Sequence, residues 1–364
     1  MFKKLRIAQI APIWNDIPPK NYGGIERIVY SITEELIRRG HEVTLFATSS
    51  SKTSARLVST VISPMAGKIA WKNPSYTIFN ISEAYKRANN FDVIHSHADF
   101  WCFPFTDFTS VPTIHTLHNL LPKDKDDHEF QFYTRYKNQK LISISNNQRQ
   151  GLPWNFVDTV YNGIDAQKFS FSSSRGNYLF WTGRITYEKG AKDVLLVAKK
   201  LKMPLVFAGH LIEDNKEFFE KEVKPLLDDK LITIIGDITL EEEAKYYKNA
   251  YCTLMPIHWD EPFGLVMAES LACGTPVIAY NRGSVPEVIR DGVTGFIIDQ
   301  DNEDRPGKGT WMIKKQGIEG LVEAIKRIGE IDRAVCRKHV QDNFTVERMV
   351  ENYEKVYHEI ISKK

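Results

Sequence analysis

Two glutamates lie eight residues apart in the segment EPFGLVMAE, with Glu261 at its start and Glu269 at its end. Pro262 suits the first turn of a helix, because its missing N–H is not needed there, and the apolar residues that follow predict a helical body. Eight residues of helix rise by about 12 Å, so the two carboxylates can neither share a proton nor bind one metal ion together. Their spacing suits two separate points on one long ligand.

Four backbone amides between these glutamates would open the predicted helix. Such N–H groups, together with the helix dipole, attract anionic oxygen and most often phosphate. The ligand would then offer hydroxyls, phosphate and hydroxyls in that order, which is the shape of a nucleotide sugar: hexose, diphosphate, ribose. The four amides belong to Phe263, Gly264, Leu265 and Val266.

Two cations, Arg184 and Lys189, follow a predicted strand in the segment NYLFWTGRITYEKG. A diphosphate leaving group gains negative charge as the glycosidic bond breaks, and two fixed cations stabilise that charge without a metal ion. Isolated cations ahead of a helix are usually surface charges. The position at the end of a strand favours a functional role for this pair.

The E-x7-E pattern of Glu261 and Glu269, and the following ACGTPVIAYNRGSVPEVIRDGVTGFI, resemble the retaining glycosyltransferases of family four, which have the GT-B fold. The resemblance implies that Glu261 contacts the transferred sugar, Glu269 the ribose, and Arg184 and Lys189 the diphosphate. It also implies an α/β protein of two doubly wound, parallel-sheet, Rossmann-like domains that face each other across a cleft.

Gly23 and Gly24 precede the first predicted helix, in NYGGIERIV. Glycines there permit close backbone approach, and the helix N-terminus supplies a second positive end for the phosphates or the sugar. The chain has no G-x-G-x-x-G after its first strand and no G-x-x-x-x-G-K-[ST], so dinucleotide and P-loop sites are not supported. Bacterial-type glycogen synthases carry a lysine where this chain has Asn21, which disfavours an ADP-glucose synthase.

His118 ends a predicted strand in HTLHN, where a histidine can bond hexose hydroxyls, and the family has a matching histidine. His95 and His97 alternate along another strand, and this H-x-H resembles the first metal ligands of some barrel hydrolases. His115 and His118 could complete such a metal site, but the second half of the chain has no barrel pattern. We therefore disfavour a metal hydrolase.

The pair Asp299 and Asp301 matches the metal-binding D-x-D of the other major glycosyltransferase architecture. Two residues make a weak motif, and cations at the phosphates make a metal unnecessary. We expect a solvated loop here, no metal ion and no cofactor besides the donor substrate. Residues 299–317 have no clear counterpart and predict an insertion or a solvent-exposed loop.

The length of 364 residues exceeds what one core usually supports, so we expect two domains. A hydrophobic fraction of 42% and a net charge of +2 give no indication of nucleic-acid binding, which needs a concentrated basic surface. No stretch is long enough to span a bilayer, and the N-terminal apolar run is too short and interrupted for a signal peptide. We expect a cytoplasmic protein, and peripheral contact with the inner membrane face stays open.

Four cysteines without C-x-x-C spacing predict neither a disulfide framework nor a zinc site. We expect small buried residues in a reducing compartment: Cys102, Cys252, Cys273 and Cys336.

Apolar runs and helical periodicity alternate along the chain, which predicts parallel sheets with helices on both faces. The serine-rich FSFSSSRGN interrupts the alternation, and we place the domain boundary there. We expect an N-terminal acceptor-side domain over 1–168 and a nucleotide-sugar domain over 169–344. By the family resemblance, the helix over 345–364 crosses back to the N-terminal domain. The predicted strands are 5–11, 41–48, 91–97, 111–119, 140–145 and 155–163, then 177–183, 203–209, 230–236, 250–256, 275–280 and 295–299. The predicted helices are 25–40, 189–201, 216–227, 240–249, the segment after 262 and the last helix.

The resemblance implies transfer of a hexosyl group from a nucleotide diphosphate sugar to an acceptor hydroxyl with retention of configuration, and UDP-glucose is the best single donor. An epimerase or phosphorylase of the same architecture, and a non-catalytic sugar-nucleotide sensor, are the alternatives. Acceptors that stay open are a sugar, a lipid-linked molecule or a small aromatic. The segment APIWNDIPPKNYGGIERIV resembles a subgroup linked to glucosylation of a pterin. Aromatic residues suited to stacking on an acceptor are those of 99–108 with Trp14, Tyr22, Trp71 and Trp154.

Overall fold

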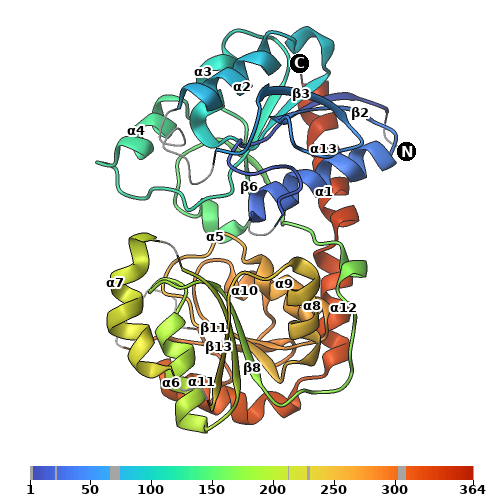
Figure 1. Cartoon of the computed structure of the whole chain (residues 1–364). Helices are drawn as coiled ribbons and strands as arrows, with labels where there is room; N and C mark the ends of the chain where they lie inside the picture. The colour runs from blue at the N-terminus through green and yellow to red at the C-terminus, as the bar shows by residue number, and fades with distance from the viewer. Residues whose placement is uncertain are drawn as a thin grey trace. The chain divides into compact units, whose positions relative to one another are not determined.

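The computed structural model describes residues 3–20, 23–65, 74–211, 213–227, 230–301 and 309–363. The chain divides into two compact α/β units (Figure 1). The first comprises Met1–Ile164 with Thr345–Lys364, and the second comprises Asp165–Phe344. Four positions discussed above lie outside the described residues: Asn21, Tyr22, Trp71 and the stretch 302–308.

The first unit contains a parallel sheet of seven strands within its described residues, in the order β3-β2-β1-β4-β5-β6-β7. Six of these strands lie within predicted ones. The seventh, β3, was not predicted, because it is an edge strand whose side chains are mostly half-exposed and whose sequence lacks a buried apolar run. The strands are β1 Arg6–Ile10, β2 Glu42–Thr48, β3 Arg56–Val61, β4 Val93–Ser96, β5 Thr113–Thr116, β6 Leu141–Ser143 and β7 Phe156–Thr159.

Helices of the first unit pack their apolar stripes on this sheet and on one another. The last helix, α13, buries a stripe that includes Val350, Tyr353 and Tyr357, and it lies against α1. The helices are α1 Gly24–Arg38, α2 Ser75–Tyr85, α3 Phe103–Thr106, α4 His128–Arg135, α5 Asn146–Arg149 and α13 Val346–Ser362, with short 3₁₀ turns at Ala88–Asn90 and Asp99–Cys102.

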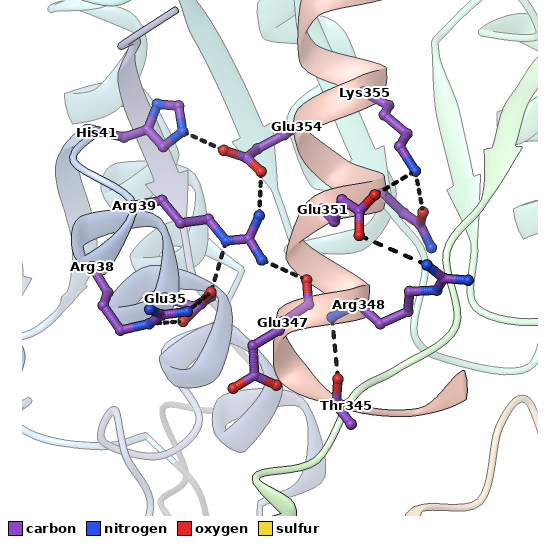
Figure 2. A network of polar contacts seen from close by, with 11 residues as sticks. Glu35, Arg38, Arg39, His41, Thr345, Glu347, Arg348, Glu351, Glu354 and Lys355 are labelled. Atoms are coloured by element: carbon purple, nitrogen blue, oxygen red, sulfur yellow. Dashed lines mark hydrogen bonds and ion pairs between the residues drawn. The ribbon is translucent and has the colours of Figure 1, made fainter. Parts of the chain in front are cut away.

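Arg39, which follows α1, connects α1 to α13 (Figure 2). Its guanidinium donates to Glu35 at 2.7 Å, to Glu354 at 2.6 Å and to the carbonyl oxygen of Glu347 at 2.8 Å. His41 accepts from the amide of Leu5 through Nδ1, so a neutral His41 carries its proton on Nε2 and donates to Glu354 at 2.8 Å. These bonds hold α13 in register with α1.

The second unit contains a parallel sheet of six strands in its described residues, in the order β10-β9-β8-β11-β12-β13. Figure 1 shows α6 and α11 on one side of this sheet and α8, α9 and α12 on the other. The strands are β8 Leu179–Arg184, β9 Leu205–His210, β10 Ile232–Ile235, β11 Cys252–Met255, β12 Val277–Tyr280 and β13 Gly295–Ile298. The helices are α6 Ala191–Leu201, α7 Lys216–Phe218, α8 Leu240–Asn249, α9 Leu265–Ala272, α10 Val285–Val288, α11 Gly317–Arg327 and α12 Arg333–Asn343, with 3₁₀ turns at Ala166–Lys168, Glu213–Asn215 and Ile328–Glu330.

The single helix predicted over 216–227 was wrong. After α7 the chain continues as a π turn over Phe219–Val223 and a 3₁₀ turn over Lys224–Leu226. Pro225 has no N–H to donate and its ring clashes with the carbonyl group four residues earlier, so a regular α-helix cannot continue through it.

The described residues between β13 and α11 form a loop with several exposed residues, as predicted, but part of this loop is buried. Ile313 is buried, and the Trp311 indole and the Asn281 amide both donate to Asp299, each at 3.1 Å. The described part of 299–317 is therefore packed against the second unit, and Asp299 is not a freely solvated carboxylate.

The strand order of each sheet reverses at one point, where two neighbouring strands send their following loops in opposite directions. This point lies between β1 and β4 in the first sheet and between β8 and β11 in the second. In open parallel sheets, ligands bind beyond the carboxyl ends of the strands at such a point. The residues that follow β1, β4, β8 and β11 are therefore where a ligand is expected.

The four cysteines are buried and free, as predicted. In the part of the chain that the structure describes, every helix is too short or too polar to cross a membrane.

Candidate functional site

Arg184 is the last residue of β8, opposite His210 at the end of β9. The backbone of the strand fixes where the side chain starts. Its Nε is buried and has no hydrogen-bond partner among the described residues. A buried, unpaired guanidinium N–H carries a desolvation cost that a bound anion would relieve.

Lys189 lies in the loop between β8 and α6. Its carbonyl oxygen accepts from the Trp181 indole at 3.1 Å, and its amide donates to Thr186 Oγ1 at 3.2 Å. Gly190 follows with φ 70°, and a Cβ there would lie 2.0 Å from the carbonyl oxygen of Pro256. The helix therefore begins at Ala191, not at Lys189 as predicted, because the left-handed glycine directs the chain against the end of β11.

Lys189 Nζ lies 2.6 Å from Glu261 Oε2, and the two side chains are 20% and 12% exposed. They are 72 residues apart in sequence, and the fold brings them together across the switch point between β8 and β11. Trp259 was not among the predicted site residues. Its indole N–H donates to the same Glu261 oxygen at 2.9 Å, and its ring lies 4.5 Å from Lys189 Nζ. An aromatic residue two positions before the acid was the available signal.

The backbone of Glu261 is held from the loop after β12. The amide of Ser284 donates to the Glu261 carbonyl oxygen at 2.9 Å. A Cβ on Gly283 would lie 2.3 Å from both the nitrogen and the oxygen of Glu261. Glu261 is thus placed by two loops, and only glycine at position 283 permits their close approach.

Helix α9 begins at Leu265, later than predicted. Gly264 is its N-cap with φ 78°, so Pro262 and Phe263 lie before the helix rather than in its first turn. The left-handed glycine reorients the chain after Pro262, which is why the pattern with proline in the first turn failed. Leu265 and Val266 supply first-turn amides without acceptors inside the helix, and no acidic residue lies in that turn.

Glu269 lies within α9 as predicted, but it is only 2% exposed. Tyr247 Oη lies 3.5 Å from its Oε2. The candidates Arg184, Lys189, Glu261, Phe263, Gly264, Leu265, Val266 and Glu269 all belong to the second unit, whereas Gly23, Gly24 and His118 belong to the first.

His118 lies two residues beyond β5 and is 8% exposed. Its Nε2 lies 2.9 Å from Nδ1 of His97, whose Nε2 lies 2.9 Å from the side-chain oxygen of Gln9. Burial lowers the pKa of His118 to about 3 and that of His97 well below its usual value, so both rings are neutral. Both nitrogens of His97 and Nε2 of His118 take part in hydrogen bonds between side chains, and no group of three or more potential metal ligands occurs among the described residues, which does not fit the metal-hydrolase alternative.

Gly23 is the N-cap of α1 with φ 152°, and Gly24 is the first residue of that helix. A Cβ on Gly23 would lie 2.9 Å from Glu26 Oε2, so a buried carboxyl group lies beside the first amides. Burial raises the pKa of Glu26 and outweighs its hydrogen bond from Asn15. An acidic group at this helix start favours hydroxyl groups over a second phosphate.

Asp99 follows β4 with φ 46°, a left-handed conformation that is uncommon for aspartate. Its Oδ2 accepts from the Asn119 amide at 2.7 Å, while Oδ1 is buried with no partner within the described residues. Burial raises the pKa of Asp99 to about 6. Among the candidate acceptor aromatics, Trp101 and Phe108 are exposed, whereas Phe103 and Trp154 are buried in the core.

Two family models match the chain. Residues 22–168 match the one described as Glycosyltransferase Family 4, and residues 164–309 match the one described as Glycosyl transferases group 1. An uncharacterized glycosyltransferase of Methanocaldococcus jannaschii is 24% identical over 341 residues, covering 81% of this chain and 86% of the relative. A D-inositol 3-phosphate glycosyltransferase of Thermobifida fusca is 27% identical over 274 residues, which cover 60% of each chain.

Solved structures share the fold over the full length. Sucrose-phosphate synthase of Thermosynechococcus elongatus matches with a TM-score of 0.79 at 20% identity, covering 100% of both chains. The Anabaena protein HepE, solved with UDP and glucose, matches with a TM-score of 0.73 at 15% identity, covering 98% of this chain and 100% of its own. Since the two family models together match residues 22–309, across both parallel-sheet units, this chain belongs to the glycosyltransferases with the GT-B fold.

Proposed function

We propose that the protein transfers a hexosyl group from a nucleotide diphosphate sugar, with UDP-glucose as the donor, to an acceptor hydroxyl with retention of configuration. The observation that carries this proposal is the convergence of Lys189, Glu261 and the start of α9 beyond the switch point of the second sheet. A cation and backbone amides suit the diphosphate of a nucleotide sugar, and a carboxylate suits the hydroxyls of its hexose.

Arg184 and Lys189 bind the diphosphate in this proposal, together with the amides of Leu265 and Val266. The buried, unpaired Nε of Arg184 supports an anion at the end of β8. Lys189 then exchanges its bond with Glu261 for one with phosphate, or keeps both. Charge that develops on the leaving diphosphate is stabilised by groups already in place, and the chemistry requires no metal ion.

Glu261 binds hydroxyls of the transferred hexose, and Glu269 binds the ribose. Trp259 donates to Glu261 and so fixes which way its carboxylate points. Glu269 is buried beside Tyr247, so the ribose must lie directly against α9 to make the proposed contact. HepE, which shares the fold, was solved with UDP and glucose, and this supports the choice of UDP-glucose as the first donor to test.

The transfer itself proceeds on one face of the sugar. The bond between the anomeric carbon and the phosphate oxygen breaks, and its electron pair stays on the diphosphate. The acceptor oxygen forms the new bond on the same face, and its proton passes to the departing phosphate oxygen. Arg184 and Lys189 lower the energy of this step by stabilising the charge on that oxygen.

In this proposal residues 1–168 bind the acceptor and residues 169–344 bind the donor. Residues 345–364 belong with residues 1–168. His118 bonds a hexose hydroxyl, and the start of α1 at Gly23 and Gly24 approaches the sugar rather than a phosphate, because Glu26 lies beside it. Exposed Trp101 and Phe108 suit stacking on a sugar, lipid-linked or small aromatic acceptor, of which a pterin is one. We propose a cytoplasmic location, with membrane contact at most peripheral.

Thermal stabilisation by UDP-, GDP-, ADP- and dTDP-sugars tests the donor. A ligand at about one hundred times its dissociation constant adds roughly 2.7 kcal/mol to the free energy of unfolding. We expect UDP-glucose to stabilise the protein most. The Lys189→Ala and Glu261→Ala variants should lose this stabilisation, and an unchanged shift in both would contradict the site.

A further inference from the structure

A buried chain of side-chain hydrogen bonds runs from His118 to the last helix. Gln9, which links to His118 through His97, also lies 3.2 Å from Tyr357 Oη and 3.4 Å from His95 Nδ1. Tyr357 Oη lies 2.7 Å from the same nitrogen of His95. The members of the chain come from β1, β4, α13 and the loops after β4 and β5, and apart from His118 they are at most 1% exposed.

The far end of the chain continues into α13. Nε2 of His95 lies 2.7 Å from Thr116 Oγ1, which lies 3.0 Å from Tyr353 Oη. Both tyrosines flank Glu354, whose bonds to Arg39 and His41 fix α13 against α1 (Figure 2). The two phenol groups are therefore held in place by contacts of α13 that are not part of the hydrogen-bonded chain.

The direction of these bonds follows from Gln9. Its NH₂ group donates to Tyr357 Oη at 3.2 Å and also lies 3.4 Å from His95 Nδ1, the nitrogen that Tyr357 Oη itself approaches at 2.7 Å. Its carbonyl oxygen faces His97 Nε2 and can only accept, so His97 carries its proton on Nε2. The reversed amide would leave one buried amide hydrogen without an acceptor, which costs free energy.

The position of the proton on His97 determines the position of the proton on His118. With its proton on Nε2, neutral His97 can only accept at Nδ1, so His118 must donate from Nε2. Nδ1 of His118 is then an unprotonated acceptor. This nitrogen has no partner among the described residues, and His118 is the least buried member of the hydrogen-bonded chain.

We propose that Gln9 is a positioning residue, held by Tyr357 of α13, that acts through His97 to keep His118 in the Nε2–H tautomer, so that Nδ1 accepts a hydrogen bond from a hexose hydroxyl. The tautomer stands on the geometry alone, whereas the contact with the hexose rests on the proposed function. Tyr357 of the last helix thereby determines which ring nitrogen of His118 accepts a hydrogen bond, although the two residues are more than 230 positions apart.

NMR of the full chain labelled with ¹⁵N-histidine tests the tautomer directly, because protonated and unprotonated ring nitrogens differ strongly in chemical shift. The His118→Asn variant identifies the signals of His118 among the ten histidines. We expect Nε2 protonated and Nδ1 unprotonated in the wild type. A proton on Nδ1 would overturn the inference.

Two variants test how the tautomer is held. Gln9→Leu removes all three contacts of the amide, and Tyr357→Phe removes one of its acceptors without changing the size of the ring. Both should shift His118 towards a mixture of tautomers, Gln9→Leu the more strongly. Thr33→Val is the matched control, because Thr33 Oγ1 is a buried hydroxyl of the same unit without a partner in the described chain. If Gln9→Leu does not fold, Tyr357→Phe decides, and an unchanged tautomer there contradicts the role of α13.

Binding of UDP-glucose and of UDP separates this inference from the proposed function. Gln9→Leu should weaken UDP-glucose binding about fivefold, the value of one net hydrogen bond, and leave UDP binding unchanged because UDP carries no hexose. If His118→Asn leaves UDP-glucose affinity unchanged, the proposed sugar contact of His118 fails. If His118→Asn weakens UDP-glucose binding but Gln9→Leu shifts the tautomer without doing so, the contact stands and the positioning role is wrong.

Discussion

The two units carry candidate residues of opposite character on the same topology. In the second, the residues around the β8/β11 switch point are charged and partly exposed, with Lys189 and Glu261 paired. In the first, the residues around the β1/β4 switch point are neutral, buried and linked through Gln9, His97 and His118. In the proposed function this difference corresponds to a division of tasks, since fixed charge suits a diphosphate and oriented neutral groups suit sugar hydroxyls.

The helix starts differ in the same sense. Gly264 caps α9, whose first turn has no acidic residue, so its amides and dipole are open to an anion. Gly23 caps α1, where Glu26 lies in the first turn. A glycine before a helix is thus not enough to predict a phosphate site, because the side chains of the first turn decide what the amides can bind.

The strongest test of the comparison removes a charge from the second unit. Lys189→Ala should lower kcat/KM for sugar transfer by about 10²–10³, the usual effect of losing one group that stabilises developing negative charge. Lys192→Ala is the control, because Lys192 pairs with Glu222 on the surface and both side chains are more than 40% exposed. A loss below tenfold in Lys189→Ala would contradict the proposed site.

In the first unit, removing a charge should lower the stability of the fold rather than the rate of sugar transfer. Arg39→Met leaves buried Glu354 without its guanidinium partner and Glu35 with Arg38 alone, and we expect the free energy of unfolding to fall by about 3 kcal/mol. Arg348→Met, at an exposed pair with Glu351, should cost less than about 1 kcal/mol. Denaturant unfolding measures both, and equal effects would show that Arg39 has no special role.

The neutral histidines predict a pH dependence of stability. Burial lowers the pKa of His118 to about 3, so the unfolded chain binds a proton near pH 6.5 that the folded chain does not bind. Stability is therefore lost as the pH falls below about 6.5, at about 1.4 kcal/mol per pH unit for each such histidine. The His118→Asn variant should lose stability less steeply by that amount between pH 6 and pH 4. Parallel curves in urea titrations would show that His118 is not held neutral.

The smallest effect concerns the orientation of the paired carboxylate. Trp259→Phe keeps an aromatic ring beside Lys189 and removes only the indole bond to Glu261, so donor binding should weaken about fivefold. Trp311→Phe makes the same chemical change at Asp299, elsewhere in the second unit, and should leave donor binding unchanged. Calorimetric titration with UDP-glucose distinguishes the two.

The regular elements were predictable where the buried surface is periodic. Strand β11 and helix α8 lie where their apolar patterns predicted them. Edge strand β3 was missed because it buries little, and α9 starts later than predicted because Gly264 adopts a left-handed conformation that no composition signal marks. The local sequence does not show which backbone angle φ a glycine adopts. It also does not show whether an edge strand pairs with a neighbouring strand.

The contacts among the candidate residues were not predictable from the sequence. The sequence indicated Lys189 and Glu261 as ligands of separate parts of a donor, and the structure shows them bonded to each other. Trp259 was missed because no pattern marks its bond to Glu261, and Gln9 was missed because its partners are distant in sequence and it lies in a buried strand. A polar Gln9 between the apolar residues Ala8 and Ile10 of β1 was a signal that could have pointed to the buried chain.

The place of α13 in the first unit has a consequence for biosynthesis. Gln9 finds its partner Tyr357 only after 348 further residues have been made, which takes roughly 20–70 s at the rate of a ribosome. At the end of that time the whole second unit has been made, whereas in the first unit Gln9 and His95 have stayed without their phenol partner. We expect the nascent N-terminal unit to need protection by chaperones until its last helix is released.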